Sequence, residues 1–320
     1  MPAPHPQPTT DLNKAQSDIS QHGYCFISDA LDATSISSLK HRLTQQATAE
    51  KEQGLAFEDG GPDQNWGDFR NVDGTLRPEA FTSAGGGRNQ RVWMLVNKGQ
   101  VFVDMLDHSV IRTLIDRLLG DAYLLSSHSA NIVKPGSIAM RLHTDQWWMP
   151  APTRRERQPL PVGSMTRDQF DLDEVPSTMI SPCVAVNVLW MLDAFTEENG
   201  GTHVVPSSHL SGKQPPDSTQ TAIAEAPSGT ALILDGRTWH GTGPNTSDND
   251  RRAILTTFCA PQFRPQENYC IGTHPSVLQN ATTDLLALLG FKIWNAYGRI
   301  ENPAAEFVHP KTEIIGRLGS

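Results

Sequence analysis

The chain has few cysteines, and their spacing argues against a disulfide framework and a structural zinc site. Its 320 residues include 4 cysteines, and none are spaced as Cys-x-x-Cys. A disulfide framework or a structural zinc site would need more cysteines or closer pairs. Cys183 and Cys259 lie in apolar, strand-like stretches, which is typical of reduced, buried thiols. We therefore expect a cytoplasmic protein.

Long hydrophobic segments and an excess of positive charge are also missing. The apolar runs fall far short of the ~20 residues that a membrane-spanning helix needs. Residues 1–21 are polar and proline-rich, unlike a secretory signal. The formal net charge is −9, whereas nucleic acids and anionic membranes attract basic surfaces. We expect no nucleic-acid partner and no membrane partner, and the sequence leaves the oligomeric state open.

Two histidines and a carboxylate point to a metal site. His143 and Asp145 lie two residues apart in a predicted strand that runs into a turn, so both side chains point to the same face. His240 follows a buried strand and a glycine turn. Such a set forms the facial triad that binds non-haem Fe(II) and leaves positions open for oxygen and a co-substrate. A His-x-Asp triplet alone arises by chance, but its context favours metal binding.

One of two neighbouring arginines is a candidate cation for binding a carboxylate of the co-substrate. Arg251 and Arg252 open an apolar stretch to Phe258, which we expect to run antiparallel to the strand that carries His240. A dicarboxylate that chelates iron at one end needs a fixed cation at the other, and a guanidinium binds a carboxylate bidentately. Neighbouring strand residues point to opposite faces. We assign Arg251 to the interior and Arg252 to solvent.

Several segments together resemble the phytanoyl-CoA dioxygenase family of Fe(II)/2-oxoglutarate-dependent oxygenases. The resemblance implies that His143, Asp145 and His240 bind iron, and that Arg251 and Thr242 bind the distal carboxylate of 2-oxoglutarate. The segments that carry it are Leu142–Gln146, Leu192–Thr202, Val204–His209 and His240–Gly243, followed by Arg251.

Two positions refine what the resemblance implies. Family members tend to carry a glutamine shortly before the first histidine, where this chain has Met140 and Arg141. The remaining contacts to 2-oxoglutarate are therefore open, and Asn187 either meets the co-substrate or satisfies a backbone group. Related halogenases have a small residue in place of the metal-binding carboxylate, so Asp145 argues against halogenation.

The resemblance also implies a reaction. Fe(II), 2-oxoglutarate and O₂ would oxidise an unactivated C–H bond, usually by hydroxylation, with succinate and CO₂ as co-products. Desaturation, cyclisation, epimerisation and endoperoxide formation share this chemistry and stay open. Two further alternatives are a non-catalytic cupin-like binding protein, which has no need of a co-substrate arginine, and a zinc hydrolase, for which no general base is evident.

The predicted fold is mainly β with flanking helices, built on a double-stranded β-helix, the jelly-roll of two facing sheets. We expect a disordered tail over residues 1–9 and a single oxygenase domain over residues 10–320. The expected helices cover 10–21 with Thr10 as N-cap, 33–52, 93–119 with Gly120 as the stop, and much of 277–297; the expected strands include 24–27, 123–133, 138–145 and 184–192.

Two insertions interrupt the expected barrel. Residues 54–89 are rich in glycine, aspartate and asparagine and poor in apolar residues, which is typical of functional or disordered loops. Residues 147–182 begin directly after the metal ligands, and their arginines are expected to be solvated. We predict that both insertions form lids, with Trp147 and Trp148 against a small, largely apolar substrate. Whether that substrate is free, CoA-bound or carrier-bound stays open.

Overall fold

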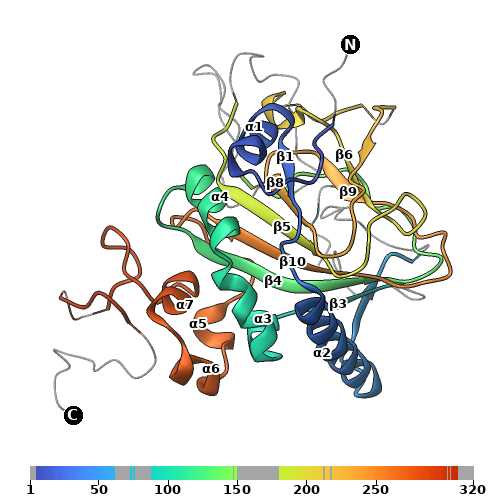
Figure 1. Cartoon of the computed structure of the whole chain (residues 1–320). Coiled ribbons are helices and arrows are strands. Elements are labelled where there is room, and N and C mark those ends of the chain that lie inside the picture. The colour runs from blue at the N-terminus through green and yellow to red at the C-terminus, as the bar shows by residue number, and fades with distance from the viewer. Residues whose placement is uncertain are drawn as a thin grey trace.

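A seven-stranded antiparallel sheet forms the centre of the computed structural model (Figure 1). The structure describes residues 5–61, 73, 75, 88–146, 148–149, 180–211, 213–216, 218–300, 302 and 304–308. In sheet order the strands are β1 (Tyr24–Ile27), β8 (Ala231–Asp235), β5 (Ala185–Met191), β10 (Arg251–Cys259), β4 (Leu124–Val133), β3 (Asn89–Val92) and β2 (Phe57–Asp59).

A smaller sheet covers one face of the large one. Its three strands are β7 (Ala222–Ile223), β6 (Thr202–Val204) and β9 (His240–Thr242), in the order β7-β6-β9. Val204 of β6 packs in one buried apolar cluster with Leu189 and Met191 of β5. Two antiparallel sheets thus face each other across an apolar interior, which confirms the predicted jelly-roll.

Helices cover the opposite face of the large sheet (Figure 1). Apolar side chains of α2, α3 and α4 share a buried cluster with Val186, Val188 and Trp190 of β5. Both faces of β5 are therefore buried, which explains why its sequence is apolar apart from Asn187. The helices are α1 (Leu12–His22), α2 (Ala33–Glu52), α3 (Gln100–Asp104), α4 (Ser109–Leu119), α5 (Tyr269–Gly272), α6 (Pro275–Asn280) and α7 (Thr283–Leu288).

Several expected elements occur, and some of them have shifted ends. The strand at 24–27 and the helix at 33–52 have the predicted bounds. The first helix is capped by Asp11 instead of Thr10, because the Asp11 carboxylate accepts hydrogen bonds from the backbone N–H groups of Asn13 and Lys14. Residues 5–9 differ from the expected disordered tail, since Thr9 forms a parallel bridge with Ile27.

The helical region at 93–119 is divided, and one expected strand is absent. Two short 3₁₀ turns and α3 precede α4, which ends at Gly120 with a positive φ of 90°. Residues 138–145 were expected as a strand, but within them only His143 forms a bridge, with His240. Strand β9 has three residues, so it offers too short an edge for a full ladder.

The cysteines of the chain are reduced, as expected. All four cysteines are free thiols. Burial raises the pKa of Cys259 to about 11 and that of Cys183 to about 12, so both stay protonated. None of the helices in the described part of the chain combines the length and the apolar character needed to cross a membrane.

Candidate metal centre

The three predicted metal ligands converge. His143, Asp145 and His240 place one donor atom each within 4.8 Å of one another. His240 Nε2 lies 3.3 Å from Asp145 Oδ2, and His143 Nε2 lies 3.6 Å from Asp145 Oδ1. Adjacent ligands with metal bonds of about 2.1 Å stand roughly 3 Å apart. The donor set and its spacing therefore fit a facial-triad metal ion.

Backbone hydrogen bonds hold these ligands together although they are far apart in sequence. His143 and His240 exchange two N–H···O bonds, of 2.9 Å and 3.0 Å, and the Asp145 N–H donates to Gly236 over 2.9 Å. The backbone segments around these ligands lie so close together that only glycine fits at Gly236 and Gly241. A Cβ on Gly236 would lie 2.6 Å from the Ala185 carbonyl oxygen, and one on Gly241 would lie 2.7 Å from that of Met140.

Carbonyl oxygens set the tautomer of both histidines. His143 Nδ1 lies 3.0 Å from the Arg141 carbonyl oxygen, and His240 Nδ1 lies 2.9 Å from that of Thr238. A carbonyl only accepts hydrogen bonds, so each Nδ1 carries the proton and donates it. In the neutral ring the lone pair is then on Nε2, the nitrogen near Asp145, which is the form of histidine that binds metal.

The Asp145 carboxylate has an amide partner. Asn187 Nδ2 donates to Asp145 Oδ2 over 2.5 Å, and Asn187 Oδ1 accepts from the Thr257 hydroxyl over 2.7 Å. We expected Asn187 either at the co-substrate or on a backbone group. In the structure its amide lies between Asp145, a predicted metal ligand, and Thr257 on the neighbouring strand. A contact of Asn187 with the co-substrate stays a prediction.

Arg251 is buried inside the barrel and lacks a full set of partners. The residue is 2% exposed, and its guanidinium carbon lies 4.2 Å from the centre of the Phe195 ring. Among the described residues, its Nε has no hydrogen-bond partner. Burial, together with the nearby charge of Arg91, lowers the pKa of Arg251 to about 9, although Asp193 opposes the shift. The guanidinium is still a cation at neutral pH.

Strand register shows which way Arg251 points. Thr257 and Asn187 are opposite each other on β10 and β5 and hydrogen bond on the inner face. The register of β10 is regular from Arg251 to Thr257, so residues separated by an even number share that face. Arg251 therefore faces the interior. Arg252 faces away and pairs with Asp193 at 2.8 Å.

One expectation about this strand is wrong. We expected β10 to run antiparallel to the strand that carries His240. Instead, β10 lies between β5 and β4 in the large sheet, and β9 pairs with β6 in the small sheet. Which strands pair with β10 depends on how the whole barrel closes. The residues of β10 alone do not determine this.

The other predicted site residues are placed only in part. Thr242 is half-buried on β9, next to His240. Trp148 is half-buried, and its ring centre lies 4.6 Å from that of Phe263. Trp147 lies outside the described residues, as do 150–179 and most of 62–87. Within the predicted 54–89 lid, Phe57–Asp59 forms strand β2 of the large sheet.

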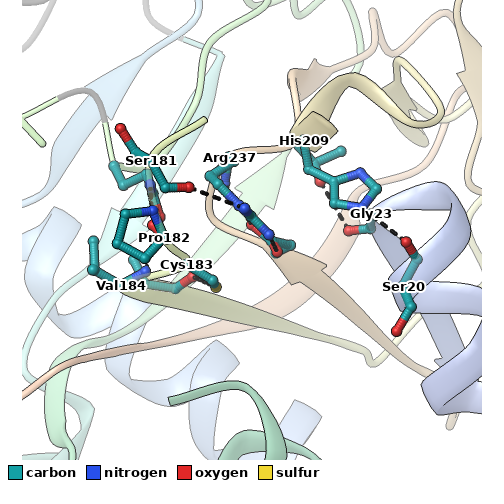
Figure 2. Close-up of polar contacts among 12 residues, drawn as sticks. Ser20, Gly23, Ser181, Pro182, Cys183, Val184, His209 and Arg237 are labelled. Atoms are coloured by element: carbon teal, nitrogen blue, oxygen red, sulfur yellow. Dashed lines mark hydrogen bonds and ion pairs between the residues drawn. The ribbon is translucent and has the colours of Figure 1, made fainter. Parts of the chain in front are cut away.

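Polar contacts anchor the chain on both sides of residues 147–182. Gln146 donates to the Pro182 carbonyl and accepts from the Val184 N–H, each over 3.0 Å. Arg237 pairs with Asp235 and donates to the Ser181 carbonyl over 3.0 Å (Figure 2). Gln146 follows Asp145, so this insertion starts and ends beside the candidate metal site.

Three residues of the site were missed by sequence reasoning. Thr257 was detectable, because it has the same strand parity as Arg251. Phe195 lies within a segment that carries the family resemblance, but nothing there marks it as a partner of Arg251. Phe263 gives no signal, because it follows β10 in an irregular loop.

A comparison with protein families matches residues 19–253 to the family "Phytanoyl-CoA dioxygenase (PhyH)". A relative from Aspergillus fumigatus, "Dioxygenase af480", is 28% identical over 287 residues, which are 88% of this chain and 77% of the relative. "Dioxygenase FUM3" of Gibberella moniliformis is 29% identical over 226 residues, which are 65% of each chain.

Solved structures share the fold. HygX from Streptomyces hygroscopicus, with nickel, 2-oxoglutarate and hygromycin B bound, has a TM-score of 0.54 at 14% identity and covers 79% of this chain and 88% of its own. The epimerase SnoN, in complex with Fe³⁺, alpha ketoglutarate and nogalamycin RO, has a TM-score of 0.54 at 15% identity and covers 82% and 91%. At these identities the likeness concerns the fold alone.

Proposed function

The chain belongs to the phytanoyl-CoA dioxygenase family of Fe/2-oxoglutarate-dependent oxygenases, and from this premise we propose that it hydroxylates an unactivated C–H bond of a small, largely apolar molecule. It is a non-haem iron dioxygenase that uses 2-oxoglutarate. Bound iron, 2-oxoglutarate and O₂ supply the oxidant, and succinate and CO₂ are the co-products. The convergence of two histidines and a carboxylate carries the proposal.

His143, Asp145 and His240 hold the iron in this proposal. Both histidines present Nε2 without a proton, because each Nδ1 donates to a carbonyl. The carboxylate contributes a negative charge that favours a divalent cation. Three protein ligands leave the other coordination positions to the co-substrate and oxygen.

Arg251 and Thr242 bind the distal carboxylate of 2-oxoglutarate. A buried guanidinium with an unpartnered Nε is costly unless an anion pairs with it. A carboxylate would supply that pair through two charge-assisted hydrogen bonds. The Phe195 ring centre lies 4.2 Å from the guanidinium carbon, and the surrounding apolar cluster excludes water. Together these features favour a planar, singly oriented anion.

Trp148 and Phe263 form an apolar wall for the substrate. Trp148 follows Asp145 by three residues, and its ring packs on Phe263. Flat aromatic surface next to a metal site favours a largely apolar molecule, and Trp147 is proposed to extend this wall. Hygromycin B in HygX and nogalamycin RO in SnoN are consistent with a free small molecule as substrate.

A second outcome of the same chemistry has one observation in its favour. SnoN, which shares the fold, is an epimerase, so C–H cleavage on this scaffold does not always end in hydroxylation. Desaturation, cyclisation and endoperoxide formation belong to the same group of outcomes. They differ in which substrate atom is held near the iron, and therefore in the shape of the pocket.

Two measurements test the proposal. Anaerobic addition of Fe(II) and 2-oxoglutarate should give a weak visible charge-transfer band, which zinc does not give. Turnover with candidate substrates should then release succinate, and mass spectrometry should show a product with one added oxygen atom. Loss of two hydrogens would indicate desaturation or ring closure, and an unchanged mass would indicate epimerisation. The absence of the charge-transfer band with Fe(II) and 2-oxoglutarate would contradict the proposal.

A further inference from the structure

A two-residue relay connects the large sheet to the Asp145 carboxylate. The Thr257 hydroxyl on β10 donates to Asn187 Oδ1 on β5 over 2.7 Å, and Asn187 Nδ2 donates to Asp145 Oδ2 over 2.5 Å. Thr257 and Asn187 are register partners. Both are buried, with 9% and 4% of their surfaces exposed.

The chemistry of the three groups allows one arrangement of these hydrogen bonds. An ionised carboxylate only accepts, so Asn187 must present its NH₂ group to Asp145 and its carbonyl to Thr257. The Thr257 hydroxyl must then act as donor. The flipped amide would place Asn187 Oδ1 against Asp145 Oδ2, and two acceptors repel each other. The hydroxyl therefore stabilises the amide orientation that the carboxylate requires.

Packing alone does not account for an asparagine at this position. Two other residues of β5 on this face, Leu189 and Met191, belong to the buried apolar cluster. A buried amide is costly unless both of its ends are hydrogen bonded. At Asn187 the carbonyl oxygen accepts from Thr257 and the NH₂ group donates to Asp145. The Asp145 carboxylate therefore satisfies the NH₂ end of the buried amide.

The relay also compensates for the position of Asp145 in the chain. Asp145 lies in a turn outside any strand, whereas Asn187 and Thr257 lie on adjacent strands in the interior of the large sheet. A ligand on a turn has more freedom than one on a strand. A hydrogen bond from the sheet removes part of that freedom before the metal binds.

We propose that Asn187 and Thr257 are a positioning pair that holds the Asp145 carboxylate in the orientation needed for metal binding. The inference rests on the proposed function, because it takes Asp145 to be a metal ligand. Neither residue is required to touch metal or substrate. Asn187 acts through Asp145, and Thr257 acts through Asn187.

Metal affinity tests this pair without relying on turnover. Metal-free, full-length protein is titrated anaerobically with Co(II), and the visible absorption of the bound ion is recorded. We expect Asn187→Ala to weaken Co(II) binding by roughly 10- to 100-fold, as outer-shell substitutions commonly do. Thr257→Val should weaken it by roughly 2- to 10-fold, the effect of one neutral hydrogen bond. Thr257→Ser, which keeps the hydroxyl, should bind Co(II) like the wild type.

A matched control separates positioning from general stability. Asn245 is a buried asparagine whose amide donates to the carbonyls of Val133 and Asn249 in a turn. Asn245→Ala should lower the melting temperature and leave Co(II) affinity unchanged. The Thr257→Val and Thr257→Ser pair keeps the test decisive if Asn187→Ala does not fold.

The outcomes distinguish two failures. Wild-type protein that does not bind Co(II) would remove the metal role of Asp145, and the proposed function would fail with it. Normal Co(II) binding by the wild type and by folded Asn187→Ala would overturn only the positioning pair. Equal losses in Thr257→Ser and Thr257→Val would also overturn it, because the hydroxyl would then have no part.

Discussion

The guanidinium carbon of Arg251 lies 4.2 Å above the ring centre of Phe195, and both side chains are almost fully buried. A cation stacked on an aromatic face gains electrostatic attraction and loses rotational freedom. The Arg251 Nε has no hydrogen-bond partner in the part of the chain that the structure describes. Phe195 thus stabilises the cation without occupying the groups that bind a carboxylate.

The first prediction concerns Arg251. Arg251→Ala should raise the KM for 2-oxoglutarate, because an unpaired carboxylate in this interior costs about 2–5 kcal/mol. Arg251→Lys should lie between the wild type and the alanine variant, since an ammonium keeps the charge and loses the planar fork. Steady-state kinetics at saturating substrate, with varied 2-oxoglutarate, measures the effect.

Arg252 provides the control for this prediction. It pairs with Asp193 away from the interior, so Arg252→Ala should leave the KM for 2-oxoglutarate near the wild-type value. A large KM increase in Arg252→Ala with no change in Arg251→Ala would make Arg252 the carboxylate ligand.

The second prediction concerns the metal ligands. Ala at position 143, 145 or 240 should abolish turnover and Fe(II) binding, because one of three protein donors is lost. The fold should remain, since the strands around the site keep their packing. Circular dichroism and anaerobic Fe(II) titration measure the two effects separately. Exposed His41 offers a control, and His41→Ala should keep both properties. Normal succinate release by His240→Ala would contradict the assignment.

Sequence reasoning identified the features that short segments encode. The spacing of His143 and Asp145 is local, and so is the mainly apolar sequence of β5. Strand parity separated Arg251 from Arg252, because alternation within one strand needs no knowledge of its partners. The jelly-roll followed from the family resemblance.

Features that depend on distant partners could not be predicted in this way. The segment 138–145 has strand-like residues, but its neighbour β9 is only three residues long. The role of Asn187 depends on Asp145, which is distant in sequence and is brought close by the loop at Gly236. The position of β10 between β4 and β5 depends on how the barrel closes.

The third prediction concerns pH and a buried histidine away from the metal site. His128 is fully buried, with Nδ1 at 2.9 Å from the Thr256 hydroxyl and Nε2 at 2.9 Å from the Phe102 carbonyl. Burial lowers the pKa of His128 from 6.5 to about 4, although the Phe102 contact opposes this shift. Between these values the unfolded chain binds a proton that the folded protein does not bind.

The free energy of unfolding should therefore fall as the pH is lowered from 6.5 toward 4, by an amount on the order of 3 kcal/mol from His128. His128→Gln should be less stable at pH 7 and should show a smaller decrease over this range. Urea unfolding at several pH values measures both. Burial also lowers the pKa of His22 and His209, so part of the slope should remain. A wild-type slope in His128→Gln would contradict the prediction.

The fourth prediction concerns Trp148 and Phe263. Their ring centres are 4.6 Å apart, and each is proposed to contact the substrate. Trp148→Ala or Phe263→Ala should weaken substrate affinity by roughly 2- to 10-fold, because an aromatic contact is worth about 0.5–1.5 kcal/mol. Consumption of 2-oxoglutarate should continue, because neither residue is placed at the metal or at Arg251. The ratio of succinate to oxidised product should therefore rise.

Trp294, elsewhere in the fold, provides a control variant. It separates the loss of a substrate contact from a general loss of packing. Trp294 is half-buried beyond α7, and its ring centre lies 5.9 Å from that of Tyr297. Trp294→Ala should change stability and keep one succinate per product molecule. The oxidant forms at the iron in every variant, but its use depends on how well the target C–H bond is held. If Trp148→Ala and Phe263→Ala keep wild-type coupling and affinity, these rings are ordinary packing and the substrate wall lies elsewhere.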